Sequence, residues 1–246
     1  MDFMNSFIRH FMMTVWSMIC ISLSIVFMII FFSRQIPLVI ARTIWSPVLL
    51  WLAGAKLEVT GRENINKNLP RPIVVVSNHI SLLDIPCICR AIPVNLFWTA
   101  KSQIKRMPFF GAYMMATGMI FIDRSNKHKA IISINKAIQL IKNGKNVFIF
   151  PEGRRSVDGE TGNFKKGAFH LAVKSGADVI PVAIMGTDKV WAKKNFRLHP
   201  GKIKVAIGTP IPTANYDETS IPELTNTVRE HVIALFNDQV TTPQTF

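Results

Sequence analysis

A histidine and an aspartate lie five positions apart, directly after a run of apolar residues. The apolar run is 72–77, and the pair is His79 and Asp84. A histidine oriented by a carboxylate is the simplest general base for activating a hydroxyl group near neutral pH. Chance alone gives about one histidine in twenty an aspartate at this offset, and His79 is the only one of the six histidines that has it. The pair therefore needs support from the rest of the chain.

The elements expected along the chain would place this pair at the carboxyl end of a strand. Short apolar runs predict strands at Leu57–Thr60, Ile73–Val76, Leu96–Thr99, Met119–Ile122, Val147–Phe150, Val179–Ile184 and Lys202–Ile207. Helical patterns occupy Leu82–Ala91, Pro108–Ala116, Lys127–Lys142, Gly167–Lys174 and Ile221–Phe236. This alternation predicts an α/β fold, with a mostly parallel or mixed sheet of about seven strands flanked by helices.

Further polar residues follow the other predicted strands, in the loops where such folds collect their active residues. They are Lys101, Asp123, Arg124, Glu152, Gly153, Arg154 and Arg155. The lysine and the three arginines are candidates to bind an anionic headgroup, because arginine matches phosphate with two donors and lysine acts as a point charge. The glycine would let the backbone approach a ligand closely. The glutamate could hydrogen-bond a substrate hydroxyl or pair with an arginine, and the sequence leaves both open.

Several of these residues also have an ordinary structural interpretation. Ser81 and Asp84 have the spacing of a helix capping box, although a capping carboxylate can still face an imidazole. Arg124 directly follows Asp123 and could form an ion pair with it, while Gly153 could serve only a turn. The sequence alone does not choose between these interpretations.

The N-terminal part of the chain is apolar enough to enter a membrane. No charge occurs from Phe11 to Ser33, and about 23 residues as a helix would reach about 35 Å, enough to cross a bilayer core. The stretch lacks the small residues of a signal-peptide cleavage site, which favours a retained segment. A second stretch, Ile36–Ala55, is expected to lie in the interface with Arg42 reaching toward headgroups. We therefore expect a pair of membrane-anchoring helices in residues 1–55 and a catalytic domain in residues 56–240.

Charge is distributed unevenly along this chain of net charge +14. Twenty of the 29 lysines and arginines lie between Lys101 and Lys204, with only six of the 15 acids. Such a field suits an anionic membrane surface or an anionic substrate. Nucleic acid is disfavoured, because no zinc-finger, RNP or helix-turn-helix pattern is present. If the first apolar run spans the membrane, the cations that follow it predict a domain on the cytoplasmic face. The alternative is a hydrophobic hairpin that anchors the protein without crossing.

Four short blocks follow one another in the chain: Asn78–Asp84, Gly118–Arg124, Phe150–Ser156 and Val179–Val182. In order and spacing they resemble the glycerolipid acyltransferase family, and within it the 1-acylglycerol-3-phosphate acyltransferases. The blocks of that family read N-H-x-x-x-x-D, G-x-x-F-I-D-R, F-P-E-G-T-R-S and V-I-P-V. One position departs from the pattern, since Arg154 stands where the family usually has threonine. This departure bears on which acceptor headgroup the protein binds.

The resemblance implies an acyltransferase of phospholipid biosynthesis. It would move a fatty acyl group from acyl-CoA or acyl carrier protein to the sn-2 hydroxyl of lysophosphatidic acid, giving phosphatidic acid. His79 would take the proton of the acceptor hydroxyl, Asp84 would orient the imidazole, and Arg124 and Arg155 would hold the acceptor phosphate. The resemblance implies no cofactor and no metal ion.

Three other functions stay open at this point. The first is acyl transfer to a different lysolipid, and the second is lipid binding without catalysis in the same basic crevice. The third is a metal-dependent hydrolase in which His79 and Asp84 are ligands. That last function is disfavoured, because no further histidine or carboxylate lies nearby at ligand spacing.

Overall fold

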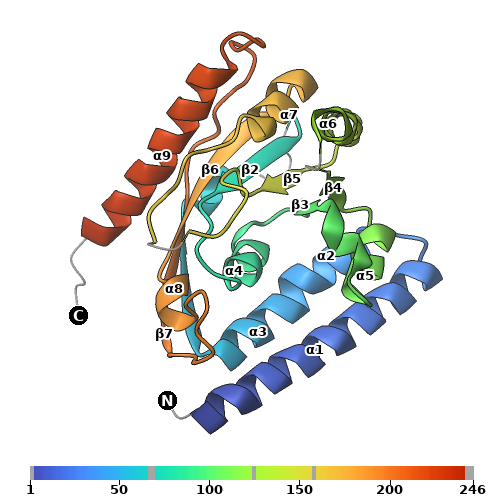
Figure 1. The fold of residues 1–246 in the computed structure, drawn as a ribbon, viewed down its shortest axis with the longest axis vertical. Helices are drawn as coiled ribbons and strands as arrows, with labels where there is room; N and C mark the ends of the chain where they lie inside the picture. The colour runs from blue at the N-terminus through green and yellow to red at the C-terminus, as the bar shows by residue number, and fades with distance from the viewer. Residues whose placement is uncertain (1–2, 66–69, 124–125, 157–158, 242–246) are drawn as a thin grey trace.

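The computed structural model describes residues 3–65, 70–123, 126–156 and 159–241 (Figure 1). Within these residues, the strands form one seven-stranded sheet with helices on both faces. Two apolar helical segments at the N-terminal end of the chain lie side by side along one side of the molecule. The predicted α/β fold and the N-terminal pair of apolar helices are confirmed.

The sheet is mixed, with the order β1-β7-β6-β2-β5-β3-β4. Strands β6, β2, β5, β3 and β4 run parallel to one another, whereas β7 is antiparallel to β6 and β1 is parallel to β7. The bounds are β1 Ala55–Thr60, β2 Ile73–Ser77, β3 Phe97–Lys101, β4 Ile120–Ile122, β5 Val147–Ile149, β6 Asp178–Met185 and β7 Gly201–Ile207. Each predicted strand is found, with ends that differ by at most two residues.

All five predicted helices are also found, and the structure adds short ones. The predicted ones are α4 Asp84–Ala91, α5 Phe110–Ala116, α6 Lys127–Lys142, α7 Gly167–Ser175 and α9 Ile221–Thr241. The additions are η2 Arg62–Asn64, η3 Ser102–Arg106 and α8 Thr187–Val190. Helix α9 continues past its predicted end at Phe236, because residues 237–241 contain neither proline nor glycine to stop it.

Strand β2 lies at the centre of the core, which explains its unbroken run of β-branched residues. All five of its residues are buried. Val74 and Val76 belong to one hydrophobic cluster, together with residues of α6, α7 and α9. Ile73 and Val75 belong to a second cluster on the opposite face, together with residues of α3 and α4. This alternation fixes β2 between two helical layers. The turn that carries His79 directly follows the carboxyl end of β2.

The apolar helices are α1 Phe3–Ile30 and a second helical run built from α2 Ile36–Ile40, the π-helical segment η1 Ala41–Trp45 and α3 Ser46–Ala53. Pro47 lacks a backbone N–H and is the second residue of α3, just after the π-helical segment, and the helical run continues through it. By length and composition alone, both α1 and the α2–α3 run could cross a membrane.

Helix α1 contacts residues 191–198 near its first turns. The Ser6 hydroxyl, which is fully buried, accepts a hydrogen bond from the backbone N–H of Leu198 at 3.1 Å. The His10 imidazole lies 2.8 Å from the carbonyl of Phe196 and packs against the ring of Trp191, with centroids 4.7 Å apart. The start of α1 is therefore attached to the loop that follows α8.

The middle and the far half of α1 make further contacts. Trp16 donates to the carbonyl of Trp45 at 3.2 Å, so the two apolar helices are joined at mid-length. Further along, buried Ser24 hydrogen-bonds Tyr113 of α5. Helix α1 thus lies along the domain from its first turns to its last third, while its outer face is apolar and exposed.

Arg42 differs from its expected placement. It was expected to reach lipid headgroups, but its Nη1 donates to the carbonyl of Pro93, between α4 and β3, at 2.7 Å. The reason is that α4 packs against η1, so this face of the second apolar helix is turned toward the domain.

Candidate active site

His79 and Asp84 meet where β2 ends and α4 begins. The Nδ1 atom of His79 lies 2.7 Å from Oδ2 of Asp84. A carboxylate in this position accepts, so Nδ1 carries the proton and directs Nε2 away from Asp84. The aspartate side chain is fully buried, whereas 15% of the histidine side chain is exposed. The imidazole is therefore partly accessible to solvent, and its carboxylate partner is not.

The Asp84 carboxylate is surrounded by donors, which a buried charge requires. Its Oδ2 accepts the backbone N–H groups of Ile80 at 2.7 Å and Ser81 at 3.0 Å, in addition to the imidazole. Its Oδ1 accepts the hydroxyl of Thr187 at 2.5 Å. The Ser81 hydroxyl donates to the carbonyl of Trp191 and does not cap α4. The aspartate therefore both holds its own turn and faces the imidazole, without a reciprocal capping box.

The His79 ring is also fixed from its flat side. It stacks on Phe150, with ring centroids 3.8 Å apart and an angle of 10° between the planes. Phe150 in turn meets Phe148 edge-on at 4.7 Å, and Phe148 packs against Trp98 at 4.4 Å. Within the part of the chain that the structure describes, Nε2 has no hydrogen-bond partner. The ring is thus oriented in advance for a proton transfer at Nε2.

Glu152 supports the backbone of His79. Its Oε1 accepts the N–H of His79 at 2.8 Å, and its Oε2 accepts the N–H of Gly162 at 3.2 Å. Burial raises the pKa of this carboxyl group, and the two backbone hydrogen bonds oppose that rise. The backbone of His79 is also held at its carbonyl group, which accepts the N–H of Ser156 at 2.7 Å. Both oxygens of Glu152 accept hydrogen bonds from backbone amides.

The other third-block residues lie next to His79 because β5 is the neighbour of β2. Gly153 adopts a positive φ of 74°, and its N–H donates to the carbonyl of Phe150 in a tight turn. Arg154 is exposed and Arg155 is half-buried. The carbonyl of Arg155 accepts Lys193 at 2.7 Å, which adds a cation to this edge of the site.

The two remaining basic candidates lie farther along the sheet edge. Lys101 ends β3 and is exposed. Strand β5 lies between β3 and β2, so the backbone of β3 is about 10 Å from the backbone of β2 across the sheet. Arg124 lies outside the described residues. The structure therefore brings together His79, Asp84 and Glu152, with the third-block cations beside them and Lys101 at a distance.

Some participants were not singled out from the sequence. The Asn78 amide donates to the carbonyl of Ile184 and accepts its N–H, both at 2.8 Å, which ties the His79 turn to β6. Thr187 reaches Asp84 from 103 positions away. Thr187 closely follows the end of β6, so the rule that polar residues at strand ends form the site could have indicated it.

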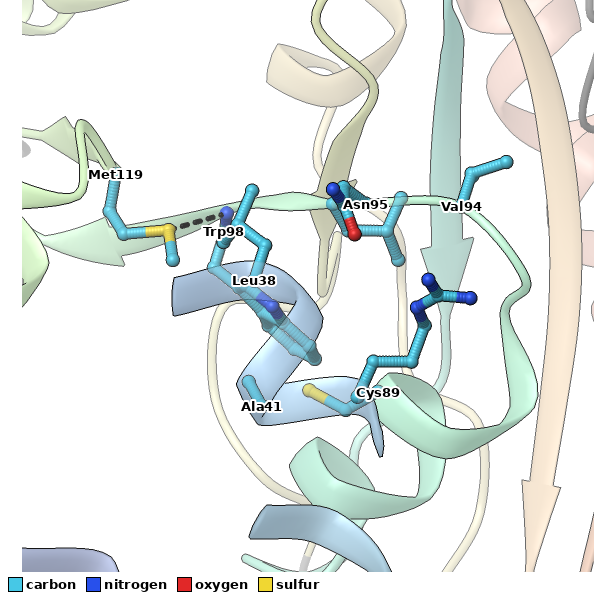
Figure 2. Close-up of a pocket in the computed structure, with 9 residues that line it drawn as sticks. Leu38, Ala41, Cys89, Val94, Asn95, Trp98 and Met119 are labelled. Atoms are coloured by element: carbon cyan, nitrogen blue, oxygen red, sulfur yellow. Dashed lines mark hydrogen bonds between the residues drawn. The ribbon is translucent and has the colours of Figure 1, made fainter. Parts of the chain in front are cut away.

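A small apolar cavity lies between the second apolar helix, α4 and β3 (Figure 2). Its volume is about 30 Å³, and its lining is Leu38, Ala41, Arg42, Cys89, Val94, Asn95, Leu96, Trp98 and Met119. Trp98 connects it to the aromatic residues beneath His79, with 6.2 Å between the ring centroids of Trp98 and Phe150. Among the residues the structure describes, no group of three or more His, Cys, Asp or Glu side chains is placed to hold a metal ion.

Comparison with known proteins gives consistent matches. A protein-family profile described as "Acyltransferase" matches residues 56–185. The 1-acyl-sn-glycerol-3-phosphate acyltransferase of Saccharomyces cerevisiae is 35% identical over 76% of this chain and 61% of its own length. The protein of the same name from Borreliella burgdorferi is 30% identical over 76% of this chain and 74% of its own. The chain thus spans less than two thirds of the yeast relative.

A solved structure is similar over nearly the whole chain. It is the crystal structure of the 1-acyl-sn-glycerophosphate (LPA) acyltransferase from Thermotoga maritima, at 27% sequence identity and a TM-score of 0.81. The match covers 98% of this chain and 97% of that one. The likeness therefore includes the N-terminal apolar helices, as well as the sheet.

Proposed function

This chain belongs to the acyltransferase family, and on that basis we propose that it transfers a fatty acyl group from an acyl thioester to the sn-2 hydroxyl of 1-acylglycerol-3-phosphate. The product is phosphatidic acid. The observation that carries the proposal is the buried carboxylate on Nδ1 of His79, which leaves Nε2 for a substrate hydroxyl. The names of the relatives indicate the acceptor.

The reaction follows from the hydrogen bonds of the imidazole. Nε2 of His79 takes the proton of the acceptor hydroxyl, and the hydroxyl oxygen attacks the thioester carbonyl carbon. The carbon–sulfur bond breaks, and the leaving thiolate receives the proton from the imidazolium. Asp84 stabilises the imidazolium during this step, because its carboxylate lies 2.7 Å from Nδ1. In this proposal the transfer is direct, without a covalent acyl-enzyme, and the lack of a G-x-S-x-G pattern in the sequence agrees with it.

Cations at the sheet edge would bind the anionic parts of both substrates. Arg155 and Arg124 are assigned to the acceptor phosphate, with Lys101 farther along the edge. Glu152 acts from beneath, by holding the backbone of His79. The donor is acyl-CoA or acyl carrier protein, and both are anionic partners that suit the net charge of +14.

One observation favours an acceptor lysolipid other than lysophosphatidic acid. Arg154 is exposed and stands where the family usually has threonine. Replacing Arg154 by threonine is expected to raise the KM for the acceptor up to about fivefold with little change in kcat, because an exposed ion pair contributes little free energy. Initial rates with a panel of lysolipids measure the effect. Lys56→Thr, an exposed change on β1 at the far edge of the sheet, is the matched control. Identical kinetics of Arg154→Thr and wild type with every lysolipid would contradict a role in acceptor choice.

Residues 1–55 are proposed to hold the protein on one leaflet of a membrane, with the chemistry in residues 56–240 on the cytoplasmic side. A helix of 28 residues is about 42 Å long, and a bilayer core is about 30 Å thick. Contacts with the domain near the start of α1, at Ser6, and in its last third, at Ser24, support a helix that lies along the membrane surface. Its exposed apolar face is available to lipid.

The topology can be checked by labelling single introduced cysteines with a membrane-impermeant maleimide. Asn5→Cys, Ser33→Cys and Lys136→Cys mark the two ends of α1 and the exposed side of α6. We expect all three to react from the same side of sealed membrane vesicles, since α1 does not cross. Wild-type protein gives the background from its free cysteines. Reaction of Asn5→Cys from the opposite side to Lys136→Cys would establish a spanning helix.

The proposed reaction is tested with purified, detergent-solubilised protein. The assay supplies a labelled acyl-CoA or acyl carrier protein with lysophosphatidic acid, and phosphatidic acid is the expected product. Transfer only to another lysolipid would keep the reaction and change the acceptor. Absence of transfer from both donors to every lysolipid, by folded protein, would overturn the proposal and leave lipid binding as the remaining function.

A further inference from the structure

A threonine that follows β6, the neighbour of β2 in the sheet, completes the environment of Asp84. Thr187 opens α8 directly after β6, and its side chain is fully buried. Its hydroxyl donates to Oδ1 of Asp84 at 2.5 Å. The other oxygen, Oδ2, accepts the three donors that belong to the His79 turn itself. Within the described residues, Thr187 is therefore the donor that serves Oδ1.

The position of Thr187 is fixed by its surroundings. Gly186 precedes it with a φ of 82°, and a Cβ at that position would lie 2.6 Å from the carbonyl oxygen of Lys202. Only glycine fits there without strain, and the resulting turn directs the chain toward Asp84. Two residues earlier, Ile184 is held by both ends of the Asn78 amide. The end of β6 and the turn after β2 are thus fastened to each other on both sides of His79.

Loss of the Thr187 hydroxyl would leave a carboxylate oxygen buried without its donor. The carboxylate could then regain hydrogen bonds only by rotating, and rotation moves Oδ2 relative to Nδ1 of His79. Proton transfer at Nε2 depends on the orientation of that ring. The effect of Thr187 would therefore reach the substrate only through Asp84 and His79.

We propose that Thr187 is a positioning residue for acyl transfer, which orients the Asp84 carboxylate and through it the His79 imidazole. The inference rests on the proposed function, because the group that it positions is the proposed base. Thr187 contacts neither substrate in this scheme. Its removal should thus lower kcat and leave the KM of donor and acceptor within about twofold.

The first test replaces Thr187 by valine, which keeps the shape and removes the hydroxyl. We expect kcat to fall about tenfold to a hundredfold, as for the loss of a buried hydrogen bond to a charged group. Thr187→Ser restores the donor and should retain most of the activity. Thr213→Val is the matched control, because Thr213 is also buried and donates to the carbonyl of Ala177, near the opposite end of β6. A kcat within twofold of wild type for Thr187→Val, or no rescue by serine, would overturn the proposal.

A double-mutant cycle separates positioning from general loss of structure. With asparagine at position 84, the carboxylate that Thr187 orients is gone, so adding Thr187→Val should change kcat by less than about twofold. Independent, multiplicative losses would show that Thr187 acts elsewhere. All rates are normalised to the folded fraction measured by thermal unfolding.

A spectroscopic readout keeps this inference separate from the proposed function. The Nδ1 proton of His79, identified in ¹⁵N-histidine spectra by its loss in His79→Gln, should exchange faster with water in Thr187→Val than in wild type. Unchanged exchange and chemical shift would contradict positioning by Thr187. If wild-type protein transfers no acyl group to any lysolipid, the proposed function fails, while this signal still decides whether Thr187 orients the pair.

Discussion

Replacing His79 by alanine is expected to lower acyl transfer to lysophosphatidic acid by about a thousandfold while the protein stays folded. The variant has no base to take the proton of the acceptor hydroxyl, and general base catalysis contributes about 10² to 10⁴ in rate. The KM of the acceptor should change little, because its phosphate is assigned to the arginines. Initial rates with purified protein measure both parameters.

His128→Ala is the control for this variant, since His128 is exposed on α6 and has no place in the reaction. In His79→Ala, the loss of the imidazole removes its stacking on Phe150, which costs on the order of 1 kcal/mol of stability. The melting temperature should therefore fall only by a few degrees. Activity within tenfold of wild type in His79→Ala would exclude His79 as the base, and a nucleophile elsewhere would then have to be sought.

Changes at Asp84 should affect both catalysis and stability, and the two can be separated by the substituent. Asp84→Asn keeps the shape but not the charge, and kcat is expected to fall by about 10³ because the imidazolium loses its counter-charge. Asp84→Ala also leaves the N–H groups of Ile80 and Ser81 and the hydroxyl of Thr187 without an acceptor. These buried donors should cost on the order of 3 kcal/mol of stability.

The alanine variant is thus expected to melt about 6–12 °C below wild type, as measured by thermal unfolding in detergent. The Asp84→Asn variant should melt at a temperature between those of Asp84→Ala and wild type. Its amide oxygen can still accept hydrogen bonds from the N–H groups of the His79 turn. Asp178→Asn, at the opposite end of β6 from Thr187, is a suitable control and should keep wild-type kcat. If Asp84→Ala were as stable as wild type, the donors around the carboxylate would have to find other acceptors.

Local patterns in the sequence predict most of the fold. The contacts that they miss are those that depend on the order of the strands in the sheet. The apolar run of β2 and the alternation of strands with helices carry enough information, because burial on both faces demands β-branched residues. The strand-end rule also brings Glu152 next to His79, since β5 lies beside β2. The strand-end rule also applies to Thr187, but its pairing with Asp84 and the Asn78–Ile184 clamp depend on β6 being the other neighbour of β2. No spacing in the chain reveals that order.

The role of Glu152 illustrates a second limit. A substrate hydroxyl and an arginine are the partners that its residue type suggests, yet its carboxylate oxygens accept backbone N–H groups of His79 and Gly162. Which amides point at a side chain depends on the conformation of two separate turns. Hydrophobic periodicity does not describe the conformation of turns. The N–H groups of His79 and Gly162 could therefore not be identified from the sequence as the partners of Glu152.

The attachment of α1 to the loop after α8 has a consequence for protein engineering. A chain shortened to begin after α1 would lack the Ser6 hydroxyl and the His10 ring, which hold Leu198, Phe196 and Trp191. The carbonyl of Trp191 in turn accepts the hydroxyl of Ser81, inside the His79 turn. Trimming the hydrophobic N-terminus to ease expression and crystallisation would thus remove contacts that support the turn carrying the proposed base. A well-behaved soluble fragment would differ from the intact protein in more than its solubility.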